Sequence, residues 1–166
     1  PVVSIHNAPV TATISKGERF HAELADLGNR LGTQQLGLNI TSIPGGKTAF
    51  PFHHHVANEE YFLVLSGTGT VRFGDSITQV NEGDLFFFPA GGPELAHQVS
   101  NGSAAEPLRL LSMSTSISPE IVGYPDSQKF GVRHLRNDPK GGPPIAFRYV
   151  GREKDRLDYW DGEQAD

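Results

Sequence analysis

Cysteine is absent from the 166 residues of this chain, which rules out a disulfide framework, a thiolate nucleophile and any iron–sulfur or zinc-finger site. A metal ion held by this protein must therefore have nitrogen and oxygen ligands. Long apolar runs are missing as well. The longest ones, around 61–65 and 85–88, are far too short to cross a bilayer, so no membrane partner is expected.

Basic clusters are also missing. The chain carries 14 lysine and arginine residues against 19 aspartate and glutamate residues, for a formal net charge of -5. Because binding to a nucleic-acid backbone depends on a positively charged surface, we expect a small-molecule substrate and no nucleic acid. No charged-then-apolar signal segment opens the sequence, and the expected location is the cytoplasm.

Glycine (19) and proline (12) separate short runs rich in valine, isoleucine, phenylalanine and threonine, which is typical of an all-β protein. The turn between Phe73 and Ser76, formed by Gly74 and Asp75, predicts a tight hairpin. The only candidate for a helix is 18–27, and 118–120 is expected to start a further helical turn. The predicted strands are 34–43, 52–55, 60–65, 69–73, 76–80, 85–88, 95–99 and 108–114.

The chain is long enough for one domain, and its pattern changes twice. We expect an N-terminal extension over 1–33, a barrel core over 34–115 and a C-terminal extension over 116–166, with 137–144 as a loop. Tyr159 and Trp160 are expected to pack on the barrel or on a second subunit. Because 61–65 and 85–88 are apolar on both faces, the predicted assembly is a homodimer.

Three consecutive histidines stand at the start of the strongest motif. His53 and His55 are one residue apart, so on a β-strand both imidazoles leave the same face and can bind a single divalent ion. His54 points to the opposite face and is left out of the site. Three further histidines are interpreted as surface or hydrogen-bonded residues: His6, His21 and His134.

Two clusters in 46–101 closely resemble the paired motifs of the cupin superfamily. The first cluster departs from the usual spacing by one extra residue between Gly46 and His53, and the second by a longer loop between Gly91 and His97. The other spacings agree with the family pattern. The matching positions are Gly46, His53, His55, Glu60 and Gly67 in the first motif, and Gly83, Pro89, Gly91, His97 and Asn101 in the second.

The resemblance implies a double-stranded β-helix, also called a jelly-roll barrel, that binds one metal ion. It implies that the ligands are His53, His55, Glu60 and His97. Glu60 is preferred over Glu59 because only Glu60 keeps the family spacing to Gly67. Glu59 is interpreted as a carboxylate that faces solvent or contacts one of the ligands.

Three neutral imidazoles and one carboxylate suit Mn, Fe, Co, Ni or Zn. Four protein ligands leave two positions open on an ion that prefers six, whereas they close a tetrahedral zinc site. The ligand set therefore favours Mn, Fe or Ni. Because free imidazole protonates near pH ~6.5, metal affinity is expected to fall below about pH 6.

Strand parity also predicts the surroundings of the ion. If His53 and Glu60 face inward, Phe62 and Val64 do so too, with Phe86 or Phe88 across the barrel. The pocket should then be apolar with a polar metal site at its floor.

Cupins carry many activities, so three functions remain open. The first is a metalloenzyme whose ion acts as a Lewis acid on a small polar substrate, as in sugar-phosphate isomerases. The second is a cupin dioxygenase, and the third is a non-catalytic barrel that binds a metal or a small molecule. The sequence has no Gly-x-Ser-x-Gly nucleophile motif, and the candidate general bases are Glu59 and Glu94.

A phosphorylated substrate requires a lysine or arginine at the pocket. Three such residues lie on or near the predicted strands: Lys47, Arg72 and Arg109. Each is interpreted as a surface charge.

Overall fold

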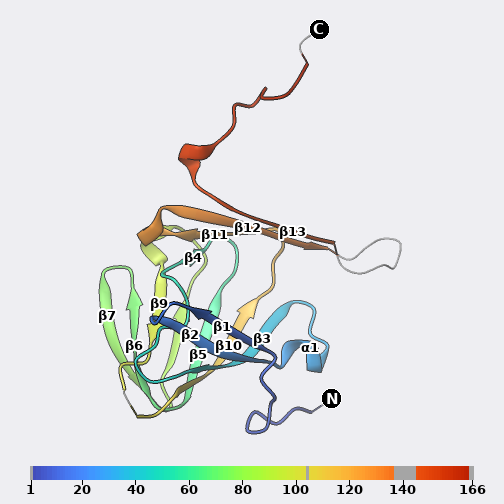
Figure 1. Cartoon of the computed structure of the whole chain (residues 1–166). Helices are drawn as coiled ribbons and strands as arrows, with labels where there is room; N and C mark the ends of the chain where they lie inside the picture. Colours follow the sequence, from blue (N-terminus) through green and yellow to red (C-terminus); the bar gives the residue numbers. More distant parts are fainter. Residues whose placement is uncertain (1, 104, 137–144, 165–166) are drawn as a thin grey trace.

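The computed structural model describes residues 2–103, 105–136 and 145–164 (Figure 1). Within them one short helix, α1 (Gly28–Leu31), and three short 3-10 helices accompany the strands. The 3-10 helices are η1 (Pro93–Leu95), η2 (Pro125–Ser127) and η3 (Glu153–Asp155). The strands are β1 (Ala12–Lys16), β2 (Phe20–Asp26), β3 (Leu36–Ile43), β4 (His54–His55), β5 (Glu60–Ser66), β6 (Thr68–Phe73), β7 (Ser76–Asn81), β8 (Leu85–Phe88), β9 (His97–Ser100), β10 (Leu108–Thr115), β11 (Glu120–Tyr124), β12 (Lys129–Arg136) and β13 (Ile145–Gly151).

The barrel is made by two sheets that enclose one apolar core. A six-stranded sheet has the order β1-β2-β3-β10-β5-β8, and a three-stranded sheet has the order β7-β6-β9. The core draws buried side chains from both: Ile43, Val64 and Leu110 from the larger sheet, and Val71 and Val99 from the smaller one. The expected all-β jelly-roll fold is confirmed.

The strands predicted within 34–114 are all present, with ends shifted by at most two residues. Their periodicity and turn residues are local properties, which explains the agreement. The predicted hairpin is also present. Phe73 and Ser76 are paired across the two-residue turn between β6 and β7, and Gly74 has φ +54, a backbone conformation that glycine adopts without steric cost.

The candidate helix at 18–27 is not formed. Residues 20–26 form strand β2, which pairs with β1 on one side and β3 on the other. Burial of Ala22 and Ala25 against the barrel outweighs the weak helical preference of this segment. The N-terminal residues therefore add two strands to the main sheet.

A third sheet, with the order β13-β12-β11-β4, lies across one end of the barrel (Figure 1). We call it the C-terminal sheet. The helical turn expected at 118–120 is wrong, because Glu120 begins strand β11 and pairs with Arg133 on β12. The loop expected at 137–144 lies outside the described residues.

The chain leaves the C-terminal sheet as a tail that extends away from the barrel (Figure 1). Tyr159 and Trp160 contact each other edge to face and remain 86% and 69% exposed. The expectation that they pack on the barrel of their own chain is therefore wrong, and packing on a second subunit stays a prediction. In the described part of the chain, no helix has the length and apolar character that crossing a membrane requires.

Candidate metal centre

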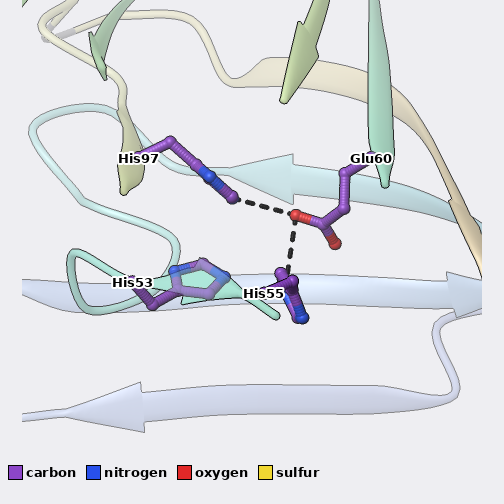
Figure 2. Close-up of side chains that lie close together, drawn as sticks. All are labelled: His53, His55, Glu60 and His97. Carbon is purple, nitrogen blue, oxygen red and sulfur yellow. Dashed lines mark hydrogen bonds and ion pairs between the residues drawn. The ribbon is translucent and has the colours of Figure 1, made fainter. Parts of the chain in front are cut away.

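Four side chains from three parts of the barrel meet at one point (Figure 2). His53 and His55 come from the segment that includes β4, Glu60 begins β5, and His97 begins β9. One ligand atom from each lies within 4.8 Å of every other. The structure therefore brings together the four residues that the cupin motifs indicate.

Backbone pairing holds two of the histidines opposite each other. The amide of His53 donates to the carbonyl of His97 at 3.1 Å, and the amide of His97 donates back at 2.7 Å. Facing residues in an antiparallel pair project their side chains to the same side, so both rings enter the barrel. His54 points away, as strand alternation predicts, and its Nδ1 bonds to the carbonyl of Gly91 at 2.7 Å.

Glu60 links two of the imidazoles through a single oxygen (Figure 2). Its Oε2 lies 2.9 Å from Nε2 of His97 and 3.6 Å from Nε2 of His55. The Nδ1 of His53 lies 2.7 Å from the carbonyl of Pro51. Because a carbonyl only accepts hydrogen bonds, this contact puts the proton on Nδ1 and leaves the lone pair of Nε2 available for a metal ion.

Burial keeps the three histidines neutral. It is the largest cause that lowers the pKa of His53 to about 4, with the neighbouring His97 adding to the shift. The pKa values of His55 and His97 are also lowered to about 4, again mainly by burial. Neutral imidazole is the form that binds metals, so the cluster is prepared for an ion at physiological pH.

The donor set fits a divalent transition-metal ion. Atoms bound to one ion at about 2.1 Å lie at most about 4.2 Å apart, so the observed spread of 4.8 Å requires only a small contraction. Nδ1 of His55 and Nδ1 of His97 are both buried without a hydrogen-bond partner. Ligation through Nε2 would place a proton on each of these Nδ1 atoms. Next to Nδ1 of His55 there is a carboxylate toward which this N–H group can point.

That carboxylate belongs to Glu120, which sequence reasoning missed. It is 1% exposed, and its Oε1 lies 3.8 Å from Nδ1 of His55. The same oxygen accepts from the amides of Val56 and Ala57 at 3.1 and 3.3 Å. Burial raises the pKa of Glu120, while those two amides and the charge of Arg133 oppose the shift. No local motif marks this residue, because it reaches the site only through the C-terminal sheet.

The cluster opens into a cavity of about 310 Å³, within the usual range for small-molecule sites. The ring of His97 stacks flat on Phe88, with centroids 3.8 Å apart and planes 3° apart. Phe62 lines the cavity and Val64 is buried beside it, as strand parity predicts. The remaining lining mixes apolar and polar side chains, so the apolar pocket expected from strand parity is present only in part. The apolar members include Leu24, Ala49, Phe50, Val99 and Leu110, and the polar members include Asn39, Asn58, Gln98, Ser112, Ser114 and Thr115.

The two candidate general bases do not reach this cavity. Glu59 is exposed and precedes β5, where alternation turns it away from the side that Glu60 faces. Glu94 is also exposed, in the 3-10 helix η1, with its carboxylate beside Gly92. The structure therefore gives no support for either residue as a general base.

The three cations considered for phosphate binding lie elsewhere too. Lys47 donates to the carbonyl of Glu18, and Arg109 donates to the carbonyl of Ile5. Arg72 forms a two-bonded ion pair with Asp126. Among the described residues that line the cavity, the one lysine or arginine is Arg133 of β12, which the sequence did not single out.

A jelly-roll barrel with three histidines and one glutamate converging in its cavity defines a class of protein. Residues 39–114 match the family model of the cupin domain. The chain therefore contains a cupin domain and has the fold of the cupin superfamily.

Two curated proteins are similar over part of their length. The xanthan biosynthesis protein XanB of Xanthomonas campestris is 30% identical over 105 residues, which cover 63% of this chain and 20% of that protein. The mannose-1-phosphate guanylyltransferase RfbM of Salmonella typhimurium is 36% identical over 76 residues, which cover 46% of this chain and 15% of that protein. The matched region thus spans a fifth or less of these relatives.

Two solved structures are similar over most of the chain. A putative sugar phosphate isomerase from Acidithiobacillus ferrooxidans superposes with a TM-score of 0.69 at 26% identity, covering 82% of this chain and 80% of that one. A sugar phosphate isomerase of the cupin superfamily from Silicibacter pomeroyi superposes with a TM-score of 0.75 at 20% identity, covering 97% and 98%. The second likeness concerns the fold alone.

Proposed function

We propose that this chain is a metal-dependent enzyme that acts on a small hydroxylated substrate, with the chemistry of a sugar-phosphate isomerase. One observation carries the proposal. The cluster of His53, His55, Glu60 and His97 opens into a cavity whose other walls are rich in hydroxyl and amide groups. Such groups can exchange hydrogen bonds with several substrate hydroxyls.

The comparisons support the same substrate class. The structure from Acidithiobacillus ferrooxidans bears the name of a putative sugar phosphate isomerase, and its likeness covers most of both chains. The name of the Salmonella relative also refers to a sugar phosphate. We infer a sugar-phosphate-like substrate for this chain.

The cluster residues would hold an ion such as Mn, Fe, Co, Ni or Zn. When bound, the ion supplies Lewis acidity, which polarises a carbonyl or hydroxyl group of the substrate. Hydrogen bonds to the backbone fix the orientation of the side-chain amides of Asn58 and Gln98. Asn58 bonds to the backbone of Ile117, and Gln98 donates to the carbonyl of Phe50 at 2.8 Å. Such anchored amides can position a substrate at little entropic cost.

Glu60 is the residue best placed to move a proton. Its Oε2 faces Nε2 of His55 and of His97 and would bind the ion with them, while Oε1 has no hydrogen bond or ion pair to a described residue. No other carboxylate lines the described part of the cavity. In the proposed isomerisation, Oε1 of Glu60 accepts the proton from the hydroxyl-bearing carbon beside the substrate carbonyl and returns it to the former carbonyl carbon, while the proton of that hydroxyl group passes to the former carbonyl oxygen.

The test is a substrate screen on protein purified without a histidine tag. Metal content is measured first, and then a panel of aldose and ketose phosphates is followed for interconversion with and without O₂. We expect equal rates in both atmospheres, loss of turnover after chelation, and recovery with added Mn, Fe, Co or Ni. Turnover that requires O₂ would instead indicate the dioxygenase. Metal binding without any turnover would indicate the non-catalytic barrel.

A further inference from the structure

A row of charged side chains crosses the C-terminal sheet above the metal cluster. Glu120 of β11 is paired with Arg133 of β12, and Arg133 is paired in turn with Arg148 of β13. Facing residues in antiparallel strands share a face, so the three side chains leave the sheet on the same side. We call this set the charged row.

The charged row lies on the face that bears the metal ligand His55. In the same sheet, His55 of β4 is paired with Val122, two residues along β11 from Glu120. Residues two apart in a strand point to the same face, so His55, Glu120 and Arg133 are all directed toward the cavity. Figure 1 shows the C-terminal sheet lying across one end of the barrel.

Arg133 is the member of the row that reaches the cavity. It lines the cavity wall, and its side chain remains exposed. No ion pair or hydrogen bond joins its guanidinium group to another residue in the described ranges, not even to Glu120. Arg72, by contrast, is neutralised by Asp126. Arg133 therefore offers an uncommitted positive charge at the edge of the site.

The charge of Arg133 influences the pKa values of three residues in and around the site. Burial is the main cause of three pKa shifts near Arg133. It lowers the pKa of His55 and raises the pKa values of Glu120 and Tyr124. The charge of Arg133 acts to lower all three. Its guanidinium group is therefore within electrostatic reach of the cluster.

We propose that Arg133 binds the phosphate group of the substrate at the cavity mouth, with Arg148 adding positive charge beside it. This inference rests on the proposed function and assigns its phosphate contact to a strand outside the cupin domain match at 39–114. A guanidinium group presents a planar fork of donors that pairs with two oxygens of an oxyanion at once. The substrate then spans from Arg133 to the cluster, with its hydroxyl groups against the amides between them.

The experiment uses inorganic phosphate as the probe. Phosphate is titrated calorimetrically into the full-length protein, metal-loaded and metal-free, at low and at moderate salt. We expect binding in both forms and a loss of tenfold or more in affinity for Arg133→Gln. Arg133→Lys should recover part of it, because the charge is kept and the planar fork is lost. Arg148→Gln should cause a smaller loss.

The matched control is Arg152→Gln, which removes the same charge just beyond β13 from a residue that does not line the cavity. It should leave phosphate binding unchanged. Titration of Mn or Ni into Arg133→Gln should give an affinity at least as tight as that of wild type, since a nearby positive charge is removed, and this would show that the fold and the cluster are intact.

Equal phosphate affinity in Arg133→Gln and wild type, or phosphate binding only to the metal-loaded form, would overturn the assignment of Arg133. Either result leaves the proposed function standing, because metal binding and turnover are measured separately. Loss of the proposed function has a different signature: phosphate still binds through Arg133, but no sugar phosphate is converted.

Discussion

Oε1 of Glu120 lies 3.8 Å from Nδ1 of His55, on the side of the ring opposite the nitrogen that faces Glu60. Carboxylates in this position fix the orientation and the proton of a histidine ligand. Both residues lie in the C-terminal sheet, Glu120 on β11 and His55 on the neighbouring strand β4, which carries part of the first motif. The sheet that covers the barrel thus completes the surroundings of the metal cluster.

Glu120→Gln should lower metal affinity by about 10- to 100-fold, the usual effect of removing such a partner. Glutamine keeps an oxygen for the amides of Val56 and Ala57, so the fold should be preserved. Isothermal titration with Mn or Ni measures the affinity, and Glu59→Gln, an exposed carboxylate, is the control. Unchanged affinity in Glu120→Gln would show that His55 needs no partner at Nδ1.

His53→Ala and His97→Ala should each lose most of the bound metal. Both rings contribute to the cluster, and three remaining ligands hold an ion more weakly than four. Elemental analysis of tag-free protein should find close to one equivalent in wild type. His134→Ala is the control, since that ring bonds to Ser118 and lies outside the cluster. Full occupancy in both variants would rule out the assigned site.

Acid should weaken the fold before it protonates the metal-free cluster. The histidine pKa values of about 4 lie below the unfolded value near 6.5, so between these pH values the unfolded chain binds more protons. Stability is then fully present above pH 6.5 and falls as the pH is lowered toward 4. Each histidine contributes a loss of up to about 1.4 kcal/mol per pH unit.

Thermal unfolding between pH 7 and pH 4 measures this loss, and His53→Ala should reduce its slope. The decline in metal affinity expected below pH 6 from free imidazole should move to lower pH, because the cluster stays neutral while the protein is folded. A steep decline already at pH 6 would show that burial does not hold the rings neutral.

Gly123→Ala should destabilise the C-terminal sheet by about 1 to 3 kcal/mol, the usual cost of overpacking. The added methyl group would overlap the ring of His54, which packs against Gly123 where β11 pairs with β4. Thermal unfolding and metal titration would both report the change. Gly102→Ala, where the added group meets open space, is the control. Wild-type stability in Gly123→Ala would mean that the His54 ring moves aside freely.

The proposed homodimer predicts a particle of twice the 18.0 kDa chain mass in light scattering at micromolar concentration. Tyr159 and Trp160 would then pack on the second copy, because both rings are largely exposed in the single chain. The double change Tyr159→Ser and Trp160→Ser should shift the mass toward the monomer, while Val2→Ser, at an apolar residue that is even more exposed, should not. A monomeric wild type contradicts the proposal.

The sequence by itself determined the barrel strands and the four cluster residues. Alternation of side chains and turn chemistry act over a few residues, which is enough to fix the strands, while the four cluster residues followed from the resemblance of two segments to the cupin motifs. His97 required the second motif, because its distance in space from His53 is set by backbone pairing between remote segments.

Only the tertiary structure decided which other charges serve the site. Glu120 and Arg133 stand more than sixty residues from His55, and no local pattern distinguishes them from surface charges. They reach the cluster because β11 pairs with β4 and β12 extends the same sheet across the barrel. Glu59 adjoins a ligand in sequence, yet strand alternation turns it to solvent. Proximity along the chain is a poor guide wherever long-range strand pairing sets the neighbours of a site.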